Sequence, residues 1–177
     1  MQNYFDLFKL PQQFNIDAQL LDFNYRTLQT TVHPDKFVTG TANERMQSMQ
    51  LATTANEAYQ TLKNPTARAR YMLQLQGIDS LENSNTTMPM DFLMLQMEWR
   101  ETLEDAKIAH DIVALESLLS EVQQSTKAMQ RDVANALDST QNKEHLDLAT
   151  ELVRKLSFIE KVQADVKQAI TKLETTV

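Results

Sequence analysis

The sequence predicts an all-α protein made of two groups of helices. The 177 residues include only 2 Gly and 4 Pro, which is fewer turn-forming residues than strands and hairpins usually need. Apolar residues recur every three or four positions along most of the chain, as they do on one face of a helix. Hydrophobic residues make up 42% of the chain and charged residues 23%, so we expect a buried core and a solvated surface.

A polar stretch separates the two groups. Gly77 follows a helical pattern and suits the position just after a helix end, and the residues from Ile78 to Met88 are rich in Ser, Asn, Asp and Thr. We therefore predict a first domain at 1–76, a linker at 77–88 and a second domain at 89–177. Residues 1–77 contain 7 Lys or Arg against 6 Asp or Glu, whereas residues 78–177 contain 10 against 18. This difference in charge suggests that the two parts have different partners.

The first group should contain four helices. A short one spans about Tyr4 to Phe8 and a second about Asp17 to Val32, where Pro34 disfavours further helix. A capping box at Thr41–Glu44 begins the third helix, and Asn64-Pro65 begins the fourth. The expected buried face of the second helix is Leu21, Tyr25, Leu28 and Val32, and that of the third is Met49, Ala52, Ala55, Tyr59 and Leu62.

The second group should be a three-helix bundle. Its first helix begins near Pro89 and ends near His110, and the short connections that follow imply antiparallel neighbours. The apolar face of the second helix is Leu115, Leu118, Val122, Met129, Val133 and Leu137. The third presents Leu152, Leu156, Ile159, Val166, Ile170 and Leu173.

The segment His33-Pro34-Asp35-Lys36 lies between two amphipathic helices. Pro34 fixes its own φ and lacks an N–H donor, which makes the turn rigid. The turn presents a carboxylate, an imidazole and an ammonium, and the Asp35 carboxylate suits an arginine on a partner surface. The alternative is an ordinary interhelical turn that happens to contain these residues.

The setting of this turn resembles the J-domain family over about residues 3–76. The resemblance rests on the His33-Pro34-Asp35 turn, on Tyr25-x-x-Leu28 before it, and on Asn56-Glu57-Ala58-Tyr59-x-x-Leu62 after it. It implies a helical hairpin that stimulates ATP hydrolysis by a DnaK-like chaperone, with His33, Pro34, Asp35, Lys36 and Arg26 in the chaperone contact. The family usually has a basic second helix, whereas here that helix offers only Arg26, which predicts a weak or specialised contact.

Nearly the whole chain resembles the HscB family of iron–sulfur co-chaperones. The matching stretches are Tyr4-Phe5-Asp6-Leu7-Phe8 with Leu10-Pro11, His33-Pro34-Asp35-Lys36-Phe37, Asn64-Pro65-x-x-Arg68-Ala69-x-Tyr71-x-Leu73, and Phe92-Leu93-Met94. The resemblance implies delivery of an IscU-type cluster scaffold to an HscA-type chaperone, in support of iron–sulfur cluster assembly and protein maturation. A general J-protein for unfolded clients is the alternative function, and a helical protein with a degenerate turn is a third.

The helix from Pro89 has apolar residues on two sides. At about 100° per residue, Leu95, Trp99, Leu103 and Ala106 lie within about 60° of Phe92 and form the expected core face. A second, methionine-rich side is edged by carboxylates. This side either packs inside the molecule or forms an exposed, adaptable binding surface. The family resemblance assigns scaffold binding to Leu93, Met94, Met97, Glu98, Glu101, Asp105 and Phe158.

Several function classes are disfavoured by the composition. The chain has no Cys and three isolated His, so we expect no disulfide, thiol catalysis or metal site. No phosphate-binding glycine loop occurs, and we expect no ATP site, no cofactor and no enzymatic activity. The net charge of −7 disfavours nucleic acid as a partner. We see neither a secretory signal nor a membrane span, and expect a cytoplasmic protein.

Overall fold

The computed structural model describes residues 3–37, 40–80, 88–139 and 142–176. Every regular element within these ranges is a helix, which confirms the all-α prediction. In chain order the elements are α1 (Tyr4–Leu7), α2 (Ala18–Val32), the 3₁₀ turn η1 (Pro34–Phe37), α3 (Ala42–Lys63), α4 (Pro65–Leu75), α5 (Met90–Ala109), α6 (Ile112–Asp138) and α7 (Lys143–Thr176).

The helices begin and end at capping residues that can be recognised in the sequence. The Thr41 side chain accepts a hydrogen bond from the Glu44 backbone N–H, and the Glu44 carboxylate accepts one from the Thr41 N–H, so the predicted capping box begins α3. Asn64 caps α4, with Pro65 at its first position. His110 ends α5 in the left-handed conformation, with φ 54°.

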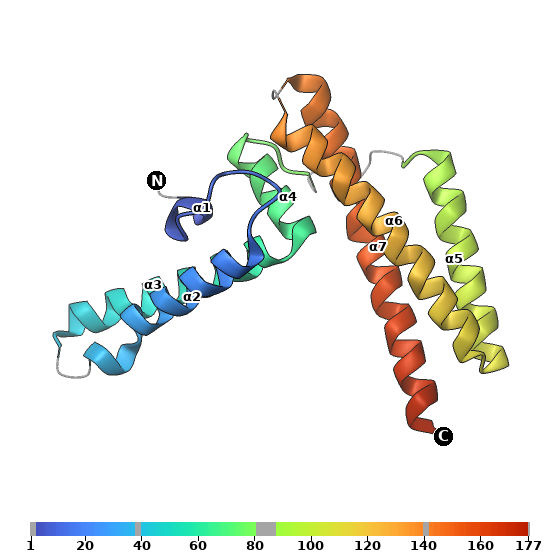
Figure 1. Ribbon diagram of the computed structural model, residues 1–177, viewed down its shortest axis with the longest axis horizontal. Helices are drawn as coiled ribbons and strands as arrows, with labels where there is room; N and C mark the ends of the chain where they lie inside the picture. Colours follow the sequence, from blue (N-terminus) through green and yellow to red (C-terminus); the bar gives the residue numbers. More distant parts are fainter. Residues whose placement is uncertain (1–2, 38–39, 81–87, 140–141, 177) are drawn as a thin grey trace.

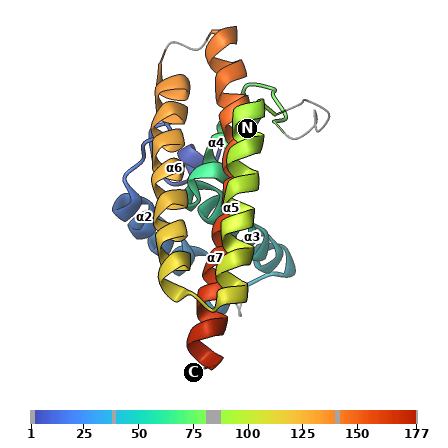
Figure 2. The same cartoon turned by 90° about the vertical axis from the view of Figure 1, so that its right-hand side faces the viewer.

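The α2–α3 hairpin projects away from the bundle of α5, α6 and α7 (Figure 1). Seen from the side, the three bundle helices lie side by side (Figure 2). One apolar cluster fills the bundle around Phe92, Trp99, Leu103, Val122 and Val166. The predicted core face of α5 is therefore confirmed, with Trp99 only 2% exposed.

A second apolar cluster joins the two groups of helices. It combines Phe5, Leu62 and Leu73 from the N-terminal helices with Val133 and Val153 from α6 and α7. Met129 packs against both clusters. The N-terminal helices therefore share a core with the bundle, and this core fixes their relative orientation.

The described ends of the predicted linker are packed against the rest of the chain. Ser80 is fully buried, and its carbonyl oxygen accepts a hydrogen bond from Arg154 Nε of α7 at 2.8 Å. Ile78 packs against the shared core. Most of the predicted linker, residues 81–87, lies outside the described residues, and the domain boundaries stay a prediction.

The predicted buried face of α3 is wrong at one position. Met49 is 61% exposed, whereas Ser48, one residue earlier, is 5% exposed. The Ser48 hydroxyl donates to the carbonyl oxygen of Val32 at 2.5 Å. A search for apolar periodicity selects the methionine, but the end of α2 requires a hydrogen-bond donor at this place.

Candidate functional site

The turn after α2 lies at the outer tip of the hairpin, far from the bundle (Figure 1). The backbone of Pro34–Phe37 forms a 3₁₀ turn, in which the Lys36 N–H donates to the His33 carbonyl oxygen at 3.0 Å. The His33 and Asp35 side chains are 57% and 85% exposed. Both groups are therefore accessible to a partner.

His33 and Asp35 contact each other through one ring nitrogen. The Asp35 backbone N–H lies 3.3 Å from His33 Nδ1, and the Asp35 carboxylate Oδ2 lies 3.4 Å from the same atom. Nδ1 accepts in the first contact and donates in the second, so the position of the hydrogen on the ring decides which one forms. Either contact holds the imidazole beside the carboxylate.

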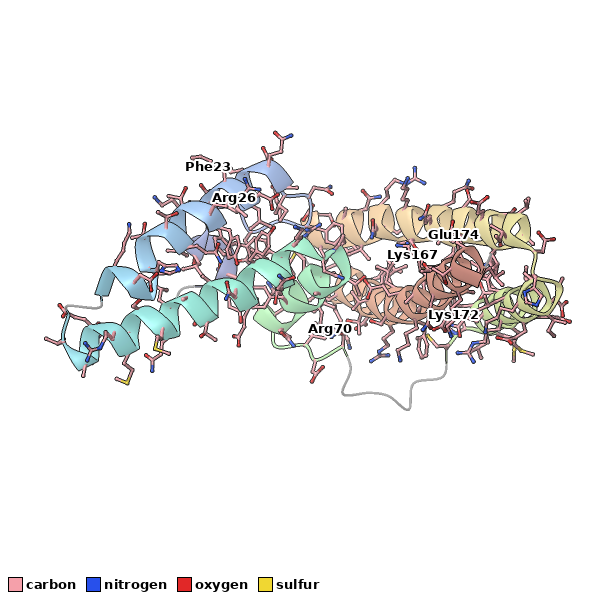
Figure 3. The ribbon with its side chains drawn as sticks, turned by 90° about the horizontal axis from the view of Figure 1, so that it is seen from below. Phe23, Arg26, Arg70, Lys167, Lys172 and Glu174 are labelled. Atoms are coloured by element: carbon pink, nitrogen blue, oxygen red, sulfur yellow. The ribbon has the colours of Figure 1, made fainter. Side chains whose placement is uncertain are left out.

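Arg26 and Lys36 border the same surface hollow as His33 and Asp35. Gln29 and Asn56 complete its polar edge. The structure thus brings the predicted basic residue of α2 together with the turn. Figure 3 labels Arg26 and Phe23 on α2, and the Phe23 side chain points away from α3 and is 66% exposed.

A tyrosine pair holds α2 and α3 together behind the turn. The rings of Tyr25 and Tyr59 stack at 3.9 Å. The Tyr25 hydroxyl donates to Asn56 Oδ1 at 2.7 Å, and that of Tyr59 donates to Asp22 Oδ1 at 2.8 Å. Lys63 donates to the Tyr59 hydroxyl at 2.7 Å, and this hydrogen bond raises the lysine pKa. These contacts make the hairpin a rigid arm for the turn.

Two features near the turn were not predicted. Ser48 bonds to the carbonyl oxygen of Val32, the last residue of α2, and so ties the residue before His33 to α3. Gln29 and Asn56 lie in the hollow beside the turn. Ser48, Gln29 and Asn56 do not belong to an apolar pattern, and each lies within a helix. Periodicity and capping rules therefore cannot identify them.

The second side of α5 is exposed to solvent. Met94 is 57% exposed and Met97 69% exposed, so neither the bundle nor the N-terminal helices cover this side. Leu93 is half-buried, and the remaining predicted residues of α5, Glu98, Glu101 and Asp105, are exposed. Of the two interpretations of the methionine-rich side, packing inside the molecule or exposure at the surface, the exposure agrees with the structure. Its role in binding stays a prediction.

Phe158 reaches the surface of α7 with 39% exposure. Lys161 lies over its ring at 5.6 Å. One turn earlier, Lys155 lies 5.7 Å from the Phe92 ring of α5, which places this stretch of α7 beside the start of α5. We call Leu93, Met94, Met97, Glu98, Glu101, Asp105 and Phe158 together the α5 surface. In Figure 1 helix α5 and the turn lie at opposite ends of the molecule.

Residues 88–167 match the family model of the HSCB C-terminal oligomerisation domain. A co-chaperone protein HscB homolog of Paraburkholderia phymatum is 45% identical over 172 residues, which cover 97% of this chain and 96% of the relative. The chain belongs to the HscB co-chaperone family. Solved structures agree with this assignment. Chaperone HscB from Vibrio cholerae has a TM-score of 0.84 at 36% identity and covers 97% of this chain and 99% of that one.

The human co-chaperone protein HscB also superposes, with a TM-score of 0.84 at 27% identity over 95% of this chain and 82% of the human one. The full-length agreement extends the family assignment to the hairpin as well as the bundle. Within the described ranges, no cluster of three or more His, Asp or Glu is placed to hold a metal ion. In the same ranges, no helix is both long and apolar enough to cross a membrane.

Proposed function

We propose that this HscB-family chain is a two-site adaptor in iron–sulfur cluster assembly, acting in the cytoplasm. The turn at His33-Pro34-Asp35 engages a DnaK-like, HscA-type chaperone and stimulates its ATPase. The α5 surface holds an IscU-type scaffold protein, which the adaptor thereby delivers to the chaperone. The chain accordingly divides into a J-domain at 1–76 and a scaffold-binding domain at 89–177.

The observation on which the chaperone half rests is the exposed turn at the tip of a rigid arm. His33, Asp35, Lys36 and Arg26 all border one hollow there. The Asp35 carboxylate can accept two hydrogen bonds from the guanidinium of a partner arginine. Lys36 and Arg26 can at the same time bind acidic groups around that arginine. The net charge of residues 1–77 is only +1, so the contact should depend on this geometry more than on long-range attraction.

The chaperone half is tested by steady-state ATP hydrolysis of a purified HscA-type chaperone. We expect the adaptor to increase the rate and a His33→Gln variant to lose most of this increase. His110→Asn is the matched control, because His110 is also exposed and Asn tolerates its left-handed backbone. Stimulation that survives His33→Gln, or that never occurs with the parent protein, would exclude this half of the proposal.

The scaffold half is supported by the exposed methionines of the α5 surface. Flexible thioether side chains adapt to a partner, and the neighbouring Glu98, Glu101 and Asp105 favour a partner with basic residues. We expect replacing Leu93, Met97 and Phe158 together by Ala to weaken scaffold binding at least tenfold in titration calorimetry. The control is Ile108→Ala with Val113→Ala, two residues that are 78% and 74% exposed outside this surface.

The same titration separates the scaffold adaptor from a general J-protein. A general J-protein would bind a denatured client as tightly as the folded scaffold. The triple Ala replacement would then lower the affinity for both ligands equally. The adaptor predicts a clear preference for the folded scaffold. A structural protein with a degenerate turn would bind neither and would leave the ATPase rate unchanged.

A further inference from the structure

A surface groove lies where α4 begins beside α6, at the junction of the two groups of helices. Its lining includes three cations, namely Arg68 of α4 and Lys127 and Arg131 of α6. Figure 1 shows α4 next to α6 at this junction. The groove is separate from both the turn and the α5 surface.

Arg68 forms the buried part of this groove. It is 9% exposed, its Nη1 donates to the Leu62 carbonyl oxygen at 2.6 Å, and its guanidinium lies 4.8 Å from the Phe14 ring. Its Nε is buried without a hydrogen-bond partner. A buried cation with an unused donor costs free energy unless an acceptor meets it. Arg68 therefore adds a positive charge to the buried wall of the groove, and this charge favours an anionic group in the groove.

The cations of the groove are not neutralised by salt bridges within the described part of the chain. Among the residues that the structure describes, no Asp or Glu makes a salt bridge with Arg68, Lys127 or Arg131. Asp138 attracts Arg68 through space, but its two oxygens already accept the backbone N–H groups of Phe14 at 2.6 Å and Asn15 at 3.3 Å. Lys127 and Arg131 therefore add positive charge without a described carboxylate in salt-bridge contact, and in a chain of net charge −7 this local positive charge favours an external anion.

We propose that this groove binds an acidic peptide segment of a protein partner in an extended conformation. Lys127 and Arg131 lie four residues apart on α6, about 6 Å along its axis. Alternate side chains of an extended strand recur on one face about every 6.6 Å, so two carboxylates at alternate positions match this pair.

The length and polarity of the groove favour a peptide over a small anion. The α6 residues of the lining run from Gln124 to Asn135, a rise of about 16 Å, which is the length of about five extended residues. Carboxamides at Gln124, Asn135 and Asn15 line the groove with the cations. A carboxamide both donates and accepts, as the peptide backbone requires.

The test uses the 177-residue chain and a fluorescein-labelled, acetylated hexapeptide of alternating Glu and Ala. We expect saturable binding in fluorescence anisotropy, and about tenfold weaker binding by Lys127→Gln/Arg131→Gln, since two exposed ion pairs are lost. The control is Arg100→Gln/Lys167→Gln, which removes the same charge from exposed bundle positions and should leave the dissociation constant unchanged. All four substituted side chains are exposed, so both variants should fold.

Four outcomes would overturn the proposal. The first is that binding of the labelled peptide does not saturate, and the second is that both double variants weaken this binding equally. The matching Gln-Ala peptide binds as tightly, which would remove the role of the carboxylates. Inorganic phosphate or a labelled oligonucleotide, at equal ionic strength, binds at least as tightly as the peptide, which would assign the groove to another class of anion.

Discussion

At the scale of single residues, Ser48 is the side chain that joins the turn to the rest of the hairpin. The last carbonyl groups of a helix have no partner within it, and Val32 ends α2 one residue before His33. Its carbonyl oxygen is satisfied by the buried Ser48 hydroxyl of α3. The geometry of the turn thus depends on a hydrogen bond from the opposite helix.

Replacing Ser48 by Ala should leave the Val32 carbonyl buried without this donor. We expect the free energy of unfolding to fall by about 1–2 kcal/mol and the stimulation of the chaperone ATPase to fall with it, although Ser48 is buried away from any partner. Urea unfolding and ATPase assays measure the two effects. Ser120→Ala, at an exposed position of α6, is the control, and equal stability of the two variants would show that the bond contributes nothing.

At the scale of elements, the capping box at the start of α3 introduces a pH dependence close to the turn. Glu44 accepts hydrogen bonds from the Thr41 N–H at 2.7 Å and from its hydroxyl at 2.9 Å. Both bonds favour the ionised carboxylate and lower its pKa from the ordinary value of 4.5. A lowered pKa in the folded state gives stability that is present above 4.5 and is lost as the pH falls through the folded pKa.

We therefore expect the first turn of α3 to fray as the pH falls below 4.5, while the middle of the helix persists. Amide hydrogen exchange of residues 44–46, read by NMR between pH 3 and about pH 6, measures the fraying. In a Glu44→Gln variant the amide side chain can still complete the cap, but it does not titrate. Identical pH profiles for the parent and this variant would contradict the role of Glu44.

The same scale shows what the sequence can predict. Capping chemistry and periodicity depend only on neighbouring residues. They predict the start of α3 at Thr41–Glu44, the start of α4 at Asn64-Pro65 and the buried face of α5 around Phe92. The burial of Ser48 in place of Met49 cannot be predicted in this way, because it depends on a carbonyl group of another helix. The exposure of Met94 and Met97 is also beyond periodicity, since an apolar side of a helix gives no information on whether another element covers it.

At the scale of the whole molecule, the shared core determines how the turn and the α5 surface are arranged. Residues such as Val133 of α6 and Leu156 of α7 continue the apolar faces of these helices past the end of the bundle core, and the N-terminal helices pack on this continuation. From the sequence these positions are indistinguishable from ordinary bundle core. The orientation that places the turn and helix α5 at opposite ends (Figure 1) is therefore a property of the fold alone.

A shared core also predicts that the two groups of helices unfold together. Leu73 of α4 is fully buried in the shared core, whereas Trp99, the single tryptophan, lies in the bundle core. A Leu73→Ala change should cost about 2–5 kcal/mol because of the cavity it leaves. If unfolding is one cooperative step, the urea midpoint of the Trp99 fluorescence falls by the whole lost free energy divided by the m-value. The circular dichroism midpoint then falls by the same amount.

The control for this experiment is Leu75→Ala, two residues along the same helix. Leu75 is 39% exposed, so its truncation should shift both midpoints only slightly. Suppose instead that Leu73→Ala produced an early loss of helix signal while the Trp99 transition kept its parental midpoint. The hairpin would then unfold independently of the bundle, and the shared core could not hold the turn and the α5 surface in a fixed arrangement.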